Sequence, residues 1–155
     1  MTPVSERSFL NNKKYPRHMA NNNPGAVKSC NYKFKGKVKK KDRTDRSYEQ
    51  FEKYYQGVLA MVEILQNYYF DFDCRTPEKL LNKYTEEIGR PAGYVMDVCK
   101  GAGFKARSPF IFNRANMNLL VSEMCRIANG RDALITSDLF AFVWLKIPLE
   151  IETEI

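Results

Sequence analysis

The sequence predicts a mainly α protein: a bundle of four to five helices over residues 47–155, a small two-stranded β element, and an extended basic arm over residues 1–46. Two observations lead to this prediction. Apolar residues recur at spacings of three and four through most of the second segment, which is the period of an amphipathic helix. The first segment holds thirteen Lys and Arg against three acidic residues, whereas the second holds twelve against fifteen. A chain of 155 residues is expected to form one domain.

The beginning of the chain is polar and rich in asparagine and proline, as in the stretches NNKK and NNNPG. So few apolar groups cannot offset the entropy that is lost when a chain is ordered. We therefore expect a flexible arm unless a partner holds it. A basic arm on a nearly neutral body is typical of proteins that touch nucleic acid.

The strongest helical pattern covers residues 47–70. Ser47 and Gln50 have the spacing of an S-x-x-Q capping box at its start. The expected apolar face consists of Phe51, Tyr54, Tyr55, Val58, Leu59, Val62, Leu65 and Tyr69.

Two shorter helices are expected over residues 77–88 and 91–103, with Gly89 at the turn between them. Thr76 is the expected cap of the first. Such a corner could be a helix-turn-helix that reads DNA, an ordinary corner of the bundle, or a protein-binding corner. The ordinary corner is favoured because few polar side chains are available to contact base edges. The candidate base-reading or corner residues are Arg90, Tyr94 and Lys100.

The last two helices are expected from Asn113 to Asn129 and from Ser137 to just before Pro148. Gly130 is the expected end of the first of these. The second segment is short, aromatic and continuously apolar, so a strand is nearly as consistent with it as a helix.

The two-stranded element rests on two stretches with a two-residue period, YKFKGKV and PLEIETEI. Paired as strands, they would bring apolar residues together on one face, and lysines opposite Glu150, Glu152 and Glu154 on the other. The pairing could form within one chain or between subunits. The apolar pairing residues are Tyr32, Phe34, Val38, Leu149, Ile151 and Ile155.

No catalytic or metal-binding pattern is visible, so we expect no enzyme, no metal and no cofactor. The four cysteines lie far apart and the only histidine is His18, whereas zinc sites cluster such ligands. Asp71 and Asp73 are better explained as solvated loop residues than as metal ligands. No apolar run is long enough to cross a membrane and no secretory signal is visible, so we expect an intracellular protein, including one inside a virion.

The leading functional hypothesis is a non-enzymatic nucleic-acid-associated protein whose basic arm binds the phosphate backbone of DNA or RNA. It would be a homo-oligomer or a subunit of a larger assembly of the virion, ribonucleoprotein or nucleoid type. Tyr32 and Phe34 would add stacking on bases, and the cluster of aromatic residues at 68–72 is either core or a stacking platform. The expected phosphate-binding residues are Lys13, Lys14, Arg17, Lys28, Lys39, Lys40, Lys41, Arg43 and Arg46.

Two alternatives remain open at this stage. One is a sequence-specific helix-turn-helix regulator that reads DNA through the corner at Gly89. The other is a protein-binding module or inhibitor whose basic arm grips an acidic partner.

Overall fold

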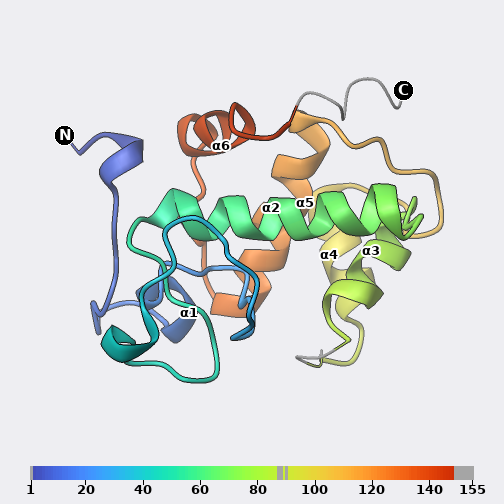
Figure 1. Cartoon of the computed structure of the whole chain (residues 1–155). Coiled ribbons are helices and arrows are strands. Elements are labelled where there is room, and N and C mark those ends of the chain that lie inside the picture. Colours follow the sequence, from blue (N-terminus) through green and yellow to red (C-terminus); the bar gives the residue numbers. More distant parts are fainter. Residues whose placement is uncertain (1, 87–88, 90, 149–155) are drawn as a thin grey trace.

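The computed structural model describes residues 2–86, 89 and 91–148. Over these residues the chain is mainly helical, as predicted, with a long helix, α2, lying across the molecule and α5 crossing behind it (Figure 1). Helices α3, α5 and α6 all contact α2, and α4 packs on α3 and α5. The elements are η1 (Val4–Glu6), α1 (Arg17–Ala20), η2 (Lys40–Asp42), α2 (Tyr54–Asp71), α3 (Pro77–Tyr84), α4 (Tyr94–Ala102), α5 (Arg114–Asn129) and α6 (Ser137–Trp144).

Helix α2 starts later than the sequence predicts. It begins at Tyr54 rather than Ser47, and the side chain of Gln56 caps it by accepting a hydrogen bond of 3.0 Å from the backbone N–H of Lys53. Residues 47–52 are not helical, because their backbone groups pair with residues between 21 and 38 and because Glu49 and Gln50 are buried there. Tertiary hydrogen bonds have therefore overridden the expected capping box at Ser47.

The four other long helices agree with the prediction, with shifts at their ends. Thr76 and Asn113 cap α3 and α5 as expected. Helix α3 ends at Tyr84, earlier than expected. Residues 137–144 form a helix rather than a strand, and Thr136 is its cap.

Much of the expected basic arm is packed against the helices. Met19 in α1 is fully buried in the core, and residues 21–27 are all buried. The prediction of a flexible arm overlooked that asparagine side chains can be buried when all their hydrogen bonds are made within the protein. The lysines remain at the surface.

The NNNPG stretch forms a turn that docks on α2. The Asn22 amide donates to the backbone oxygen of Phe51 (2.9 Å), and the Asn23 amide donates to that of Glu49 (2.9 Å). The Asn129 amide of α5 donates to the Pro24 oxygen at 3.0 Å. Three parts of the chain that are distant in sequence are therefore tied together at this turn.

Gly57 permits this docking. A Cβ atom at Gly57 would lie 1.8 Å from the backbone oxygen of Asn22, so only glycine allows the turn to approach the helix this closely.

The lysine-rich segment, residues 28–41, does not form the strand that was expected over residues 32–38. Among the described residues it makes isolated β-bridges, one from Lys28 to Tyr48 and one from Lys37 to Phe51. Leu149, Ile151 and the three C-terminal glutamates lie outside the described residues, so the pairing with them stays a prediction. Lys37 was expected to face one of those glutamates, but it pairs with Glu49 at 2.9 Å.

Glu49 is the centre of a buried charge cluster. Its side chain is fully buried and forms ion pairs with Arg43 and Lys37, and it also accepts a hydrogen bond of 2.8 Å from the backbone N–H of Cys30. The Arg43 side chain is only 7% exposed. A buried carboxylate is tolerated only when it is paired in this way, so the cluster holds residues 30, 37 and 43 in one arrangement.

We expect Gly57→Ala to lower the free energy of unfolding by at least about 2 kcal/mol, because the added methyl group meets a backbone oxygen that cannot move independently. Urea denaturation measures this. Gly101→Ala is the matched control in α4, where the nearest atoms to a Cβ belong to the flexible carboxylate of Glu123 rather than to a backbone. The control should be neutral or stabilising by up to about 1 kcal/mol, the helix propensity gained over glycine. Equal stability of both variants would contradict the close docking at Gly57.

We expect Glu49→Gln to destabilise the protein by about 3–5 kcal/mol, because it leaves Arg43 buried without its counter-charge. Glu6→Gln is the control, since Glu6 pairs with Lys53 at the surface with 59% of its side chain exposed. That change should cost less than about 1 kcal/mol. Thermal unfolding of the original protein and the two variants at low salt tests this. If Glu49→Gln lost no more stability than Glu6→Gln, the Glu49 cluster would not be a structural centre.

Candidate binding pocket

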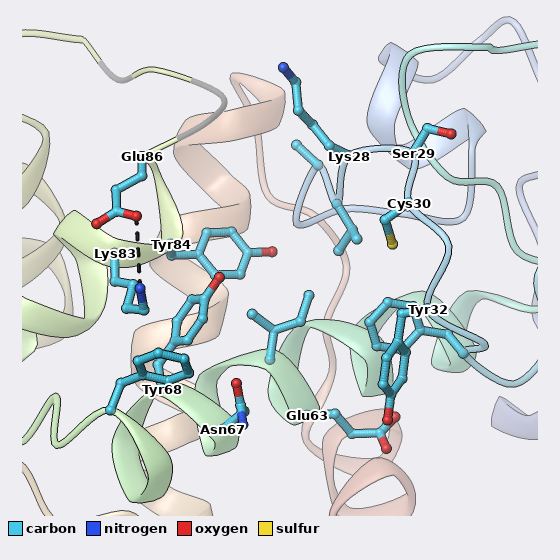
Figure 2. Close-up of a pocket in the computed structure, with 15 residues that line it drawn as sticks. Lys28, Ser29, Cys30, Tyr32, Glu63, Asn67, Tyr68, Lys83, Tyr84 and Glu86 are labelled. Atoms are coloured by element: carbon cyan, nitrogen blue, oxygen red, sulfur yellow. Dashed lines mark ion pairs between the residues drawn. The ribbon is translucent and has the colours of Figure 1, made fainter.

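A pocket of about 560 Å3 lies between residues 26–34, the outer face of α2 and the end of α3 (Figure 2). Its walls combine aromatic rings with a few charged and polar groups, which is the usual character of a ligand site. The aromatic residues that line it are Tyr32, Phe34, Tyr68, Phe72 and Tyr84. The charged and amide groups that line it are Lys28, Glu63, Asn67, Lys83 and Glu86.

The aromatic rings form two groups from different parts of the chain. The rings of Tyr32 and Phe34 lie 4.4 Å apart between centroids. Tyr68 and Phe72, one turn apart on and just after α2, lie 6.0 Å apart and nearly perpendicular. Tyr32 and Phe72 are 63% and 56% exposed, so part of each ring is open to a ligand.

Tyr84 joins the pocket to the docked turn. Its hydroxyl donates a hydrogen bond of 2.8 Å to the Gly25 oxygen, and burial raises its pKa well above the ordinary value. A Cβ atom at Gly25 would lie 2.5 Å from the sulfur of Met61. The segment that carries Tyr32 is thus held at a set distance from α2.

The charged side chains that line the pocket lie on different sides of it. Figure 2 shows Glu63 and Lys83 on opposite sides, with Lys28 on a third. The Lys83 ammonium lies 4.4 Å from the ring centroid of Phe72 and 3.8 Å from the Glu86 carboxylate. Glu63 is half-buried, and this burial raises the pKa of its carboxyl group, while the nearby charge of Lys35 opposes the shift.

The cations predicted to bind phosphate fall into two groups. Arg17 forms two hydrogen bonds with Asp45, at 2.7 Å and 2.9 Å, and Arg43 belongs to the Glu49 cluster. Both are therefore engaged in holding the N-terminal segment. Lys28 lines the pocket. The side chains of Lys13, Lys14, Lys39, Lys40, Lys41 and Arg46 are exposed.

Of the candidate base-reading residues of the corner, the two that the structure describes, Tyr94 and Lys100, do not share an exposed surface. Tyr94 is only 8% exposed and belongs to the core, where burial raises its pKa. It was predicted as a possible contact, but it is turned inward because its ring completes the packing between α4 and its neighbours. Lys100 is exposed, and Arg90 lies outside the described residues.

The aromatic cluster at 68–72 divides between two sides of α2. Tyr68 and Phe72 line the pocket, whereas Tyr69 and Phe70 pack on Phe112. Successive residues of a helix point about 100° apart, so a run of aromatic residues cannot form one platform. Asp71 accepts a hydrogen bond from Asn67, and Asp73 pairs with Arg75, both at the surface.

Sequence reasoning missed Glu63, Asn67 and Lys83 as site residues. A signal for the first was present, since Glu63 interrupts the apolar run AMVEIL within α2. Four residues separate Glu63 from Asn67, which places both side chains on one face of α2. Tertiary packing alone brings Lys83 of α3 to the same pocket as these two residues.

No group of three or more His, Cys, Asp or Glu among the described residues could hold a metal ion. Over the same part of the chain, no helix is long and apolar enough to cross a membrane. Cys74, Cys99 and Cys125 are buried free thiols, whereas Cys30 is exposed. Comparison with known proteins finds no family model that matches the chain and no curated protein that is significantly similar to it.

We expect the carboxyl group of Glu63 to titrate above its ordinary pKa of 4.5, because burial disfavours the charged form. Carboxyl NMR shifts followed through a pH titration measure this. Lys35→Ala should raise the pKa of Glu63 further, since it removes the opposing charge. A pKa at or below 4.5 would contradict the described environment. Because the folded-state pKa is raised, the protonated form favours folding, and stability should fall as pH rises through this window.

Proposed function

We propose that this protein binds single-stranded nucleic acid, with bases stacked on the aromatic rings of the pocket and phosphates contacted by the surrounding lysines. The observation that carries the proposal is that Tyr32 and Phe34, from the lysine-rich segment, line the same pocket as Tyr68 of α2 and Phe72 just after it. In this proposal the protein is not an enzyme and acts within a larger assembly, which sedimentation with and without oligonucleotide tests.

Aromatic side chains beside a basic surface are the usual means of binding single strands. Each stacked base contributes about 1–3 kcal/mol, and any base can stack because each has a π face. Tyr32 and Phe72 expose more than half of their surface. A pocket of about 560 Å3 is large enough for one or two bases.

The charge distribution supports a polyanion as the ligand. With Arg17, Lys37 and Arg43 engaged in ion pairs, the cations left at the surface include Lys39, Lys40 and Lys41 in the same segment that supplies Tyr32. Clustered cations attract phosphates and raise the rate of association, but they do not distinguish sequences.

A single strand fits the pocket better than a duplex. The faces of bases are covered by neighbouring base pairs in a duplex and are free in a single strand. The alternative of a helix-turn-helix regulator has less support, because Tyr94 is buried and α4 has only nine residues. Binding to an acidic protein would use the lysines without the aromatic rings, which makes it a distinguishable outcome of the test.

We expect labelled single-stranded DNA and RNA of about nine nucleotides to bind more tightly than duplex of the same length. Affinity should fall between about 50 and 200 mM salt, with a log–log slope of about −0.7 per phosphate contact. Tyr32→Ala and Phe72→Ala should each weaken binding by about fivefold or more, the effect of losing one stacked base. Fluorescence anisotropy measures these affinities.

Two variants serve as controls. Tyr32→Phe keeps the ring and should bind as the original protein does. Leu145→Ala removes a side chain that is 83% exposed on another part of the surface and should have no effect. Absence of binding at low salt would refute the proposal. Binding that is insensitive to Tyr32→Ala and Phe72→Ala, and equal for poly-glutamate, would instead favour an acidic protein partner.

A further inference from the structure

Glu63 is an unusual group for a site that binds polyanions, because a carboxylate repels phosphate. It is half-buried on α2 and lines the pocket next to the loop that carries Tyr32 and Phe34. Asn67 lies one turn further on the same face of the helix and lines the same pocket (Figure 2). The pair therefore presents a carboxylate and a carboxamide to any ring that stacks nearby.

These two side chains have a specific hydrogen-bonding capacity. An ionised carboxylate only accepts hydrogen bonds, and its two oxygens can accept from two adjacent N–H donors. A carboxamide both accepts and donates. Among the four common bases, guanine presents two adjacent donors, its N1–H and its 2-amino group, beside the acceptor O6. Cytosine and adenine present one amino group, and uracil or thymine presents one N–H between two acceptor oxygens.

We propose that Glu63 and Asn67 make the pocket select a base with adjacent N–H donors, guanine before the others, and disfavour thymine or uracil. This inference rests on the proposed binding of single-stranded nucleic acid. The Glu63 carboxylate would accept from N1–H and the 2-amino group. One N–H of the Asn67 amide already donates to Asp71 at 2.6 Å, so its second N–H would donate to an acceptor on the same base edge.

Partial burial makes this selection stronger than it would be at an open surface. A carboxylate that has lost part of its water must recover hydrogen bonds from the ligand, and a ligand without donors leaves it unsatisfied. Thymine would place its two carbonyl oxygens near the carboxylate, which adds repulsion. The weaker binding of thymine and the stronger binding of guanine therefore both increase the preference for guanine.

The position of the other charges is consistent with this orientation. Lys83 lies on the opposite side of the pocket from Glu63, with its ammonium over Phe72 (Figure 2). A nucleotide whose base edge faces Glu63 would direct its phosphate away from that carboxylate, toward the side of the pocket with Lys83 or the rim with Lys28. Glu63 thus lies on a different side of the pocket from Lys83 and Lys28, and the Lys83 ammonium also pairs with Glu86 at 3.8 Å.

The test uses the full chain and four oligonucleotides of about nine residues, each a thymidine strand with one central G, C, A or T, at about pH 8 so that the carboxylate is ionised. We expect the strand with G to bind about tenfold more tightly than the strand with T, within the discrimination that a bidentate base contact provides. Replacing the central guanine by inosine, which lacks the 2-amino group, should remove part of this preference without any change to the protein.

Glu63→Gln should reduce the preference for G over T to less than about twofold, while binding of the thymidine strand stays the same or improves because a negative charge is lost. Glu86→Gln is the matched control, since Glu86 also lines the pocket but pairs with Lys83. It should leave the preference intact.

The outcomes separate the two proposals. If no strand binds, the proposed function itself fails. If all four strands bind equally to the original protein, or if the preference for G survives Glu63→Gln, the selection by Glu63 is refuted while the proposed function stands. The comparison of the four strands and inosine on the original protein does not depend on the folding of any variant.

Discussion

The close approach of the turn at Asn21–Val27 to Gly57 is the contact on which the rest of this structure depends. The Asn22 oxygen occupies the place where any other residue at position 57 would have its Cβ atom. Asparagine amides satisfy the backbone oxygens of residues 49 and 51 on one side, and Asn129 of α5 closes the turn on the other. Because these polar groups are buried, each of them requires its partner, and the N-terminal segment is therefore held by many mutually dependent hydrogen bonds as well as by the burial of Met19.

This docking also creates the pocket. The turn leads directly into residues 26–34, and the Tyr84 hydroxyl of α3 binds the Gly25 oxygen within the turn. The segment is thereby held beside the face of α2 that carries Glu63, Asn67 and Tyr68, without filling the space between them. The Glu49 cluster holds the other end, where Lys37 and Arg43 return to the body. The pocket is thus enclosed by a segment that is anchored at both ends.

The same anchoring divides the positive charges by role. Arg17, Lys37 and Arg43 neutralise carboxylates within the protein, and burial of Glu49 makes two of these pairs structural. Lys39, Lys40 and Lys41 remain exposed at the surface. The net positive charge of the sequence therefore overstates how many cationic side chains can contact an anionic partner, because some of them form ion pairs that stabilise the fold. The charge that remains lies in the segment that also supplies the aromatic rings Tyr32 and Phe34.

The sequence by itself determined the helical class and the approximate limits of the five long helices, because amphipathic periodicity, Thr and Asn caps and terminal glycines are local properties. It also suggested Tyr32 and Phe34 as stacking groups, and the aromatic run at 68–72 as either core or a stacking platform. Only the tertiary structure decided that residues 47–52 are not helical, that the asparagine-rich turn is buried, and that the two aromatic groups line one pocket with Glu63 and Lys83. The physical reason is that these features depend on hydrogen bonds between residues distant in sequence, which no local pattern records. Examples are Gln50 with Asn21, 29 positions apart, and Asn129 with Pro24, 105 positions apart.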